Sequence, residues 1–289
     1  MDNDGPSRTA LVTAYARAYH QIADQPRILA DPLAARLLDV TVDELNELGR
    51  PGESGHEEIL RLGVGDRPRR LFFAARSRFA EDRVAAAVAA GVRQVVILGA
   101  GLDTFAYRHS HSGLRVFEVD HPATQAWKSE RLAASGIDLP EGLSFVPVDF
   151  ETDTLATRLA DAGFSRSDSA VFVWLGVVYY LTPDAADGTL DYVARQSGSV
   201  EVIFDYLADT DEDRAQLRAR AERAAAVGEP WFSYFAPDDI AARLRALGFT
   251  DVEDHAATDL IAGYLGDSAE FEGEPPQALR PVRILRASR

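Results

Sequence analysis

The early part of the chain carries its apolar residues at helical spacing. From residue 9 to residue 38 this spacing predicts helices in short pieces, with breaks near Gln25-Pro26 and Asp31-Pro32, because proline disfavours helix in the preceding residue. Residues 49–65, rich in glycine, are expected to form a flexible surface connection. A longer helix is predicted from about residue 68 to residue 90. The start of the chain is therefore expected to be mainly helical.

Five continuous apolar runs, rich in β-branched residues, follow this helix. Such runs are typical of parallel strands that are buried on both faces. Helix-compatible segments separate them, so the alternation predicts βαβ units and a parallel sheet. The longest apolar stretch, residues 170–181, is far shorter than the roughly 18 residues that suggest a membrane span. The five runs cover residues 94–98, 115–120, 143–149, 170–175 and 200–206.

The C-terminal part is predicted to complete the sheet. Residues 211–226 have helical propensity and charge on most faces, as expected of a solvated helix. A helix over residues 238–247, closed by Gly248, precedes a strand around Val252, and residues 282–285 form a last strand. Two closing strands favour a seven-stranded sheet.

These elements fit one α/β domain. With 289 residues, 46% of them apolar and 26% charged, the chain is long enough for a layered domain with a sizeable core. We take residues 1–289 as that domain, residues 1–66 as a helical cap and residues 207–236 as an inserted lid segment.

The charge balance and the residue types exclude several classes of partner and chemistry. Thirty basic against 46 acidic residues give a net charge of −16, which repels nucleic acid and anionic lipid, and no Lys/Arg block offsets it. The absence of cysteine excludes disulfides, zinc-thiolate sites and thiol catalysis. The first residues lack the regions of a signal peptide, which favours the cytoplasm. None of the six histidines has metal-site spacing, so no metal is predicted. The oligomeric state stays open.

A glycine-rich turn stands between the first predicted strand and the next helix. In Gly99-Ala100-Gly101-Leu102-Asp103-Thr104, the missing Cβ atoms let the backbone approach a nucleotide-like ligand closely. Thr104 stands where the dinucleotide fingerprint has its third glycine, which disfavours a pyrophosphate cradle. A purely structural strand-to-helix turn is the alternative.

Acidic residues end the next two predicted strands. Asp120 follows the glycine turn by about twenty residues, and a carboxylate there can accept both ribose hydroxyls of an adenosine ligand, NAD included. Alternatively, Asp120 caps the helix that starts at His121-Pro122. Glu118, on the same face of the strand, is the reserve candidate. Asp149 and Phe150 suit hydrogen bonding to and packing against adenine, or else form a turn beside a core aromatic ring.

Three segments together carry a family resemblance. ARSRFAED (75–82), QVVILGAGLDTFAYR (94–108) and FEVD (117–120) resemble the leucine carboxyl methyltransferase family, most closely its bacterial branch, which includes carboxyl O-methyltransferases of polyketide pathways. The likeness covers most of the chain, from TALVTAYARA near the start to PWFSYFAPDDIAARLRALGF. It implies a class I methyltransferase fold, a Rossmann-like sheet with an N-terminal helical cap, and S-adenosyl-L-methionine as the cofactor.

The resemblance also implies roles for individual residues. Arg76 would pair with the methionine carboxylate of the cofactor, and Asp120 would hold its ribose. Because Arg76 and Arg78 are two residues apart on a helix, only one of them is expected to point inward. The other is expected in a surface ion pair. The implied cofactor-binding residues are Arg76, Gly99, Ala100, Gly101, Asp103, Asp120, Asp149, Phe150 and Leu175.

Two positions depart from the family pattern. Related sequences often have glutamate before the glycine that follows the fourth strand, whereas this chain has Leu175 before Gly176. A polar contact to the cofactor is therefore expected to be absent or rerouted. The cap of the family also supplies a basic residue near the cofactor carboxylate, for which Arg17 is the nearest candidate.

The residue types favour methylation of oxygen. A carboxylic acid is ionised at pH 7, so a carboxylate acceptor needs no general base, whereas a phenol or alcohol usually benefits from one. No obvious His/Asp pair is present, which favours the carboxylate of a small organic acid or polyketide-like metabolite. The alternatives are a hydroxyl O-methyltransferase, a non-catalytic ligand-binding member of the fold, and an NAD-dependent dehydrogenase.

Aromatic residues in the cap and in the inserted segment predict the acceptor pocket. Apolar, concave walls with a few polar groups are what small-ligand sites require. Alternatively, Trp231 and Phe235 anchor the insertion on the core, and His20 has a buried structural role. The candidate pocket residues are Tyr15, Tyr19, His20, Trp231 and Tyr234.

Overall fold

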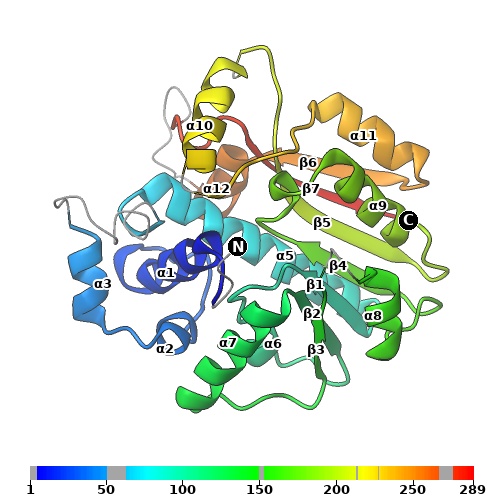
Figure 1. Ribbon diagram of the computed structural model, residues 1–289, viewed down its shortest axis with the longest axis horizontal. Helices are drawn as coiled ribbons and strands as arrows, with labels where there is room; N and C mark the ends of the chain where they lie inside the picture. The colour runs from blue at the N-terminus through cyan, green and yellow to red at the C-terminus, as the bar shows by residue number, and fades with distance from the viewer. Residues whose placement is uncertain (1–4, 51–62, 150–152, 213, 227, 267–275) are drawn as a thin grey trace.

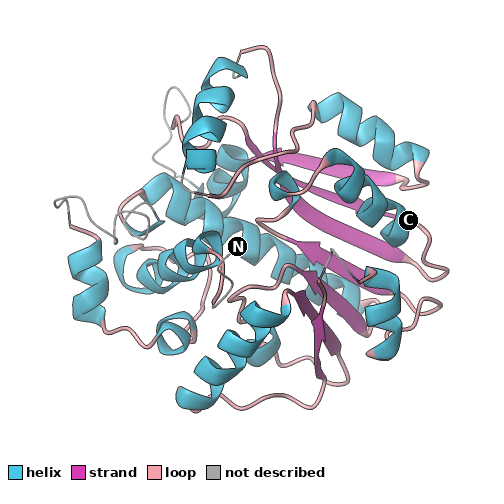
Figure 2. Cartoon of the chain, in the orientation of Figure 1, coloured by secondary structure: helices cyan, strands magenta, loops and turns pink. Residues whose placement is uncertain are grey.

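A mixed sheet of seven strands forms the centre of the structure, a computed structural model that describes residues 5–50, 63–149, 153–212, 214–226, 228–266 and 276–289. The strand order is β3-β2-β1-β4-β5-β7-β6, and β7 is antiparallel to both of its neighbours. The other adjacent pairs are parallel. The α/β sheet of seven strands predicted from the sequence is thus confirmed (Figure 2). The strands are β1 (Gln94–Leu98), β2 (Arg115–Asp120), β3 (Leu143–Pro147), β4 (Ala170–Trp174), β5 (Val200–Leu207), β6 (Asp251–Ala256) and β7 (Val282–Ser288).

Helices cover both faces of this sheet because strand side chains alternate between them. In β1, for example, Val95 and Ile97 enter one apolar cluster, whereas Val96 and Leu98 enter the other. The first face carries α5 (Arg67–Ala89), α6 (Phe105–Arg108), α7 (Pro122–Ala134) and α12 (Ala257–Leu265). The opposite face carries α8 (Leu155–Asp161), α9 (Pro183–Ala194) and α11 (Pro237–Ala246).

The N-terminal helices pack together on one side of the molecule, to the left of the sheet in Figure 1. They are α1 (Arg8–Ala23), α2 (Ala34–Leu38) and α3 (Val42–Leu48), and they form a third apolar cluster that includes Leu102 and Leu132. Outside this group, α1 makes its most extensive contact with α5. The cap is therefore attached to the first face of the sheet.

The inserted segment leaves and rejoins the sheet at neighbouring points. Asp209 N donates to Phe235 O at 3.1 Å, and Phe235 N donates to Leu207 O at 3.1 Å. Between these bonds lies α10 (Arg214–Ala226), where Leu217 is the buried residue among the described ones, as expected of a solvated helix. A short 3-10 helix, η1 (Val178–Tyr180), follows β4. No helix in the described ranges has the length and apolar character needed to cross a membrane.

Candidate functional site

The glycine turn lies at the carboxyl end of β1, where ligands bind in parallel sheets of this kind. Gly99 and Gly101 have φ angles of 64° and 48°, in the left-handed region that glycine adopts without a steric penalty. A Cβ at Gly99 would overlap Cγ2 of Val177, and a Cβ at Gly101 would lie 3.2 Å from Cβ of Ala10 in α1. The backbone of the turn is therefore enclosed by the β4 loop on one side and by the cap on the other.

Asp120 ends β2 beside this turn. One carboxylate oxygen accepts a hydrogen bond from Gly101 N at 2.6 Å, and the other accepts one from His121 N at 2.7 Å. Burial raises the pKa of Asp120, although these two N–H groups act in the opposite direction. His121, not Asp120, caps α7, because its side chain accepts from Ala123 N at 3.2 Å. The alternative of a helix-capping Asp120 is therefore wrong.

Glu118, the reserve candidate, is buried and forms an ion pair instead of a hydrogen bond to the turn. Its carboxylate accepts from Lys128 Nζ at 2.7 Å and from the hydroxyl of Tyr107 at 3.2 Å. The third predicted strand ends at Pro147, so Asp149 lies two residues beyond it, at the same edge as Asp120. Phe150 lies outside the described residues.

Arg76 projects from α5 into the interior between α5 and the sheet. Its Nη1 donates to Asp205 of β5 at 2.8 Å, and the other oxygen of Asp205 accepts from Gly176 N at 2.6 Å. The guanidinium lies over the ring of Phe73, 4.6 Å from its centroid. Arg76 is 3% exposed, yet its Nε has no acceptor among the described residues. Such an unpartnered buried donor requires an explanation, and a bound ligand is one.

The expectation that only one of Arg76 and Arg78 points inward is confirmed. Arg78 pairs with Asp82 at 2.7 Å, and both side chains are nearly half exposed. Gly176 has a φ of 75°, and a Cβ there would lie 2.9 Å from Nη2 of Arg76. Glycine at 176 is thus required for the close approach of the β4 loop to Arg76.

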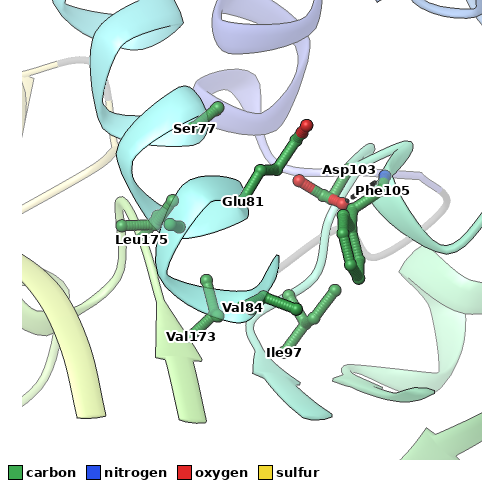
Figure 3. Close-up of a pocket in the computed structure, with 9 residues that line it drawn as sticks. Ser77, Glu81, Val84, Ile97, Asp103, Phe105, Val173 and Leu175 are labelled. Atoms are coloured by element: carbon green, nitrogen blue, oxygen red, sulfur yellow. Dashed lines mark hydrogen bonds between the residues drawn. The ribbon is translucent and has the colours of Figure 1, made fainter. Parts of the chain in front are cut away.

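A small pocket opens between α5 and the carboxyl ends of β1 and β4 (Figure 3). Its cavity volume is about 20 Å³, and the pocket is partly open to solvent. Leu175 lies on one wall, and the carboxylates of Glu81 and Asp103 lie toward one another on the opposite side. One oxygen of Asp103 accepts from Phe105 N at 2.7 Å. Burial raises the pKa of Glu81, although Arg108 acts in the opposite direction.

A buried chain of charges fastens the cap to the glycine turn. Arg17 of α1 pairs with Asp31 at 2.9 Å and donates to Leu102 O, within the turn, at 2.6 Å. Arg108 lies 3.3 Å from the same Asp31 and also bonds Glu81. Arg17 was predicted from the sequence as a residue that could lie near the cofactor carboxylate. In this structure its guanidinium donates to Asp31 and to the backbone of the turn instead.

The cap residues predicted for the acceptor pocket lie within the cap and its contact with α5. His20 is fully buried, with Nδ1 2.9 Å from Asp24 and Nε2 accepting from Ile28 N at 3.1 Å. Tyr19 lies beneath Arg70, 5.0 Å from its guanidinium carbon. Tyr15 packs against the apolar cluster of the three cap helices. His20 thus has a structural hydrogen-bonding environment.

The aromatic residues of the insertion gather elsewhere, beside η1. The Trp231 ring lies 5.8 Å from that of Tyr179, and the hydroxyl of Tyr234 donates to Trp231 O at 3.3 Å. Phe235 packs against Tyr206 of the core, with ring centroids 6.3 Å apart. The structure therefore brings Trp231 and Tyr234 together but keeps them in a different cluster from the cap tyrosines.

The cap meets the insertion through the first turn of α1. Thr9 N donates to Glu229 Oε1 at 3.0 Å, and the Thr9 hydroxyl lies 2.6 Å from that of Tyr180, which donates to Glu229 at 3.2 Å. No function was predicted for Thr9, Tyr180 or Glu229 from the sequence. The one available signal was that Tyr179 and Tyr180 are polar-tipped residues inside the longest apolar run.

Comparisons with known proteins show the family of this chain. The leucine carboxyl methyltransferase family profile matches residues 10–194. A protein named "Putative S-adenosyl-L-methionine-dependent methyltransferase YktD" in Bacillus subtilis is 32% identical over 283 residues, covering 90% of this chain and 91% of its own. A Mycolicibacterium smegmatis protein of the same description is 33% identical, covering 91% of this chain and 80% of its own.

A solved structure shares the fold. The "putative methyltransferase" of Thermobifida fusca superposes with a TM-score of 0.57 at 15% identity, covering 99% of this chain and 96% of its own. The class I methyltransferase-like fold implied by the sequence resemblance is thereby confirmed. Since the family profile spans more than half of the chain and relatives match it over most of its length, the chain belongs to the leucine carboxyl methyltransferase family.

Proposed function

We propose that this protein is an S-adenosyl-L-methionine-dependent O-methyltransferase that acts on a carboxylate of a small organic acid. The observation that carries the proposal is the arrangement at the carboxyl edge of β1, β2 and β4. There the glycine turn, the carboxylate of Asp120 and the unpartnered Nε of buried Arg76 border one region of the sheet. An adenosyl amino acid has hydroxyl groups that a carboxylate can accept from and a carboxylate that a guanidinium can donate to, so its polar groups complement these residues.

The residues present fit the cofactor. Asp120 would accept hydrogen bonds from the ribose hydroxyls, and Asp149 with Phe150 would meet the adenine. The enclosed backbone of Gly99 to Gly101 would pass under the methionine part, whose carboxylate would accept from Arg76. Ala100, Asp103 and Leu175 complete the proposed set. When bound, the cofactor supplies a methyl group on a positively charged sulfur.

The acceptor side would lie where the insertion meets η1, with Trp231 and Tyr234 among its walls. These walls would hold the acceptor oxygen facing the methyl group that the cofactor supplies. The other candidates, Tyr15, Tyr19 and His20, lie apart from Trp231 and Tyr234 in the cap. The protein aligns the two reactants and excludes water. Burial raises the pKa of Tyr179 to about 12 and also raises that of Tyr180, so neither phenol is a base at neutral pH. An acceptor that is already ionised needs none.

A hydroxyl acceptor is the second candidate, and Glu229 is the observation that favours it. This carboxylate, held by Thr9 and Tyr180, lies at the junction of cap and insertion, where it could take a proton from a phenol. The two functions differ in their product, a methyl ester or a methyl ether.

Ligand binding and product analysis test the proposal. In calorimetry we expect S-adenosylmethionine and S-adenosylhomocysteine to bind and NAD not to bind. Binding of NAD without binding of adenosylhomocysteine would reject the methyltransferase assignment in favour of a dehydrogenase.

Incubation with labelled cofactor and a panel of matched acids and phenols then identifies the acceptor class. We expect methyl esters, formed equally well by Glu229→Gln. Methyl ethers, lost in Glu229→Gln, would instead establish the hydroxyl O-methyltransferase. Cofactor binding without any product would favour a non-catalytic member of the fold.

A further inference from the structure

Thr13 in α1 is a buried hydroxyl without a hydrogen-bond partner. The residue is 7% exposed, and its Oγ1 has no partner among the described residues. Threonine within a helix usually satisfies its hydroxyl by donating to the carbonyl four residues earlier. Thr13 does not do so, although the helix is regular from Arg8 to Ala23. Its hydroxyl is therefore left available to a group that is not part of the chain.

The position of Thr13 on α1 shows which region it faces. Ala10, three residues earlier, lies against Gly101, since its Cβ is 3.2 Å from the position of a Cβ there. Arg17, four residues later, donates to Leu102 O at 2.6 Å. Residues three and four apart share one face of a helix, so Thr13 lies on the face that covers the glycine turn.

Among the described residues, Thr13 and one other unpartnered hydrogen-bond donor, each more than nine-tenths buried, border this region. The other is Nε of Arg76 on α5, the helix with which α1 makes its closest association. Both can donate hydrogen bonds, whereas Asp120, beside the same turn, can only accept them when ionised. The two donors complement a carboxylate, and the acceptor complements ribose hydroxyls.

We propose that Thr13 is a cofactor-contacting residue, whose hydroxyl donates to the carboxylate at the methionine end of S-adenosylmethionine. The inference rests on the proposed function, and it goes beyond the cofactor-binding residues that the sequence suggests. It also gives the cap a direct part in cofactor binding: α1 would contribute one donor and α5 the other. Docking of α1 on the glycine turn would then complete the site.

The experiment compares Thr13→Val with Thr13→Ser by calorimetry, using two ligands. S-adenosylhomocysteine has the amino-acid end, and 5′-methylthioadenosine lacks it. We expect Thr13→Val to weaken adenosylhomocysteine binding about tenfold, as for loss of one hydrogen bond to a charged group, and to change methylthioadenosine binding less than twofold. Thr13→Ser keeps the hydroxyl and should bind both ligands like the original protein.

Thermal unfolding without ligand separates this role from a structural one. Valine replaces an unsatisfied hydroxyl by a methyl group of similar size, so the midpoint of Thr13→Val should not fall. Thr189→Val, on α9 at the opposite face of the sheet, is the matched control and should alter neither affinity. Unchanged adenosylhomocysteine affinity in Thr13→Val, or an equal loss for both ligands, would overturn the proposal. If the original protein binds neither ligand, the proposed function itself fails.

Discussion

Asp120 combines two tasks at the level of a single side chain. Its carboxylate holds the glycine turn through Gly101 N, and the same group is proposed to bind the ribose. Because burial raises its pKa above the ordinary aspartate value of 3.8, it becomes protonated at a higher pH than an exposed aspartate does. Only the ionised form accepts hydrogen bonds with both oxygens.

We therefore predict that adenosylhomocysteine affinity is greatest above the raised pKa and falls as the pH drops through it. Asp120→Asn should weaken binding about 10- to 100-fold at neutral pH and lose most of this pH dependence. Titration calorimetry across pH measures both effects. Asp168→Asn, an exposed aspartate at the other end of the strands, is the control and should behave like the original protein. A pH dependence retained in Asp120→Asn would assign it to another group.

Gly101 is the second residue on which the site depends. In Gly101→Val the side chain would crowd Ala10 and enter the path of the ligand, and the positive φ would add strain of roughly 1–2 kcal/mol. We expect adenosylhomocysteine binding to be abolished in a variant that still folds. Gly113→Val is matched for strain, with a φ of 71° and no neighbour within 4 Å, and should retain binding. Circular dichroism and calorimetry on both variants test this, and normal affinity in Gly101→Val would move the site.

At the scale of elements, α1 is held on the sheet by charge as well as by apolar packing. Asp31 lies between Arg17 and Arg108, and all three are largely buried. Burial alone would raise the pKa of Asp31, but the two guanidinium groups lower it below its ordinary value. The cap, the glycine turn and α5 are thereby joined through one carboxylate.

Asp31→Asn should lower the free energy of unfolding by about 3–5 kcal/mol, because it leaves Arg17 buried without its counter-ion and removes one of the two carboxylates that pair with Arg108. The lowered pKa also sets the pH dependence. The stabilisation by Asp31 is fully present above the unfolded-state value near 3.8 and is lost as the pH falls through the folded-state pKa. Urea denaturation at several pH values measures both. Asp82→Asn, which breaks the exposed pair with Arg78, is the control. It should lower the free energy of unfolding by less than about 1 kcal/mol. An equal loss in both variants would contradict the stabilising role of Asp31.

At the scale of the whole molecule, the cap and the insertion meet over the carboxyl edge of the sheet. The contact between Thr9 and Glu229 joins residues 220 positions apart, and Tyr180 of the β4 loop completes it. Acceptor entry is expected to require a change at this junction, because lids of this kind cover the reacting groups and must open for substrate.

Alanine variants of two tyrosines distinguish a residue of the acceptor pocket from a residue that stabilises the cap. Tyr234→Ala should reduce turnover of the acceptor found in the panel while leaving adenosylhomocysteine affinity and the thermal midpoint nearly unchanged. Tyr19→Ala should mainly lower the midpoint, because it removes the ring beneath Arg70. Steady-state kinetics and thermal unfolding distinguish the two effects. A large drop in midpoint with unaltered catalysis for Tyr234→Ala would reject its pocket role.

The sequence by itself determined the central sheet and the position of the cofactor turn. Continuous apolar runs identify strands buried on both faces, and glycines directly after the first run identify the turn, since both signals are local. The edge strand β6 is only partly buried, and α12 directly after it was not predicted, because no side chain caps its first turn. A surface ion pair for Arg78 could also be predicted, because Asp82 is four residues later on the same helix.

Only the tertiary structure decided which partners these residues have. Arg76 is paired with Asp205, 129 residues away, and Glu118 with Lys128 rather than with the turn. Thr13 gives no sign in the sequence that its hydroxyl is unsatisfied, because satisfaction depends on every neighbour in space. Local patterns specify elements, whereas long-range packing specifies which side chains remain free to bind a ligand.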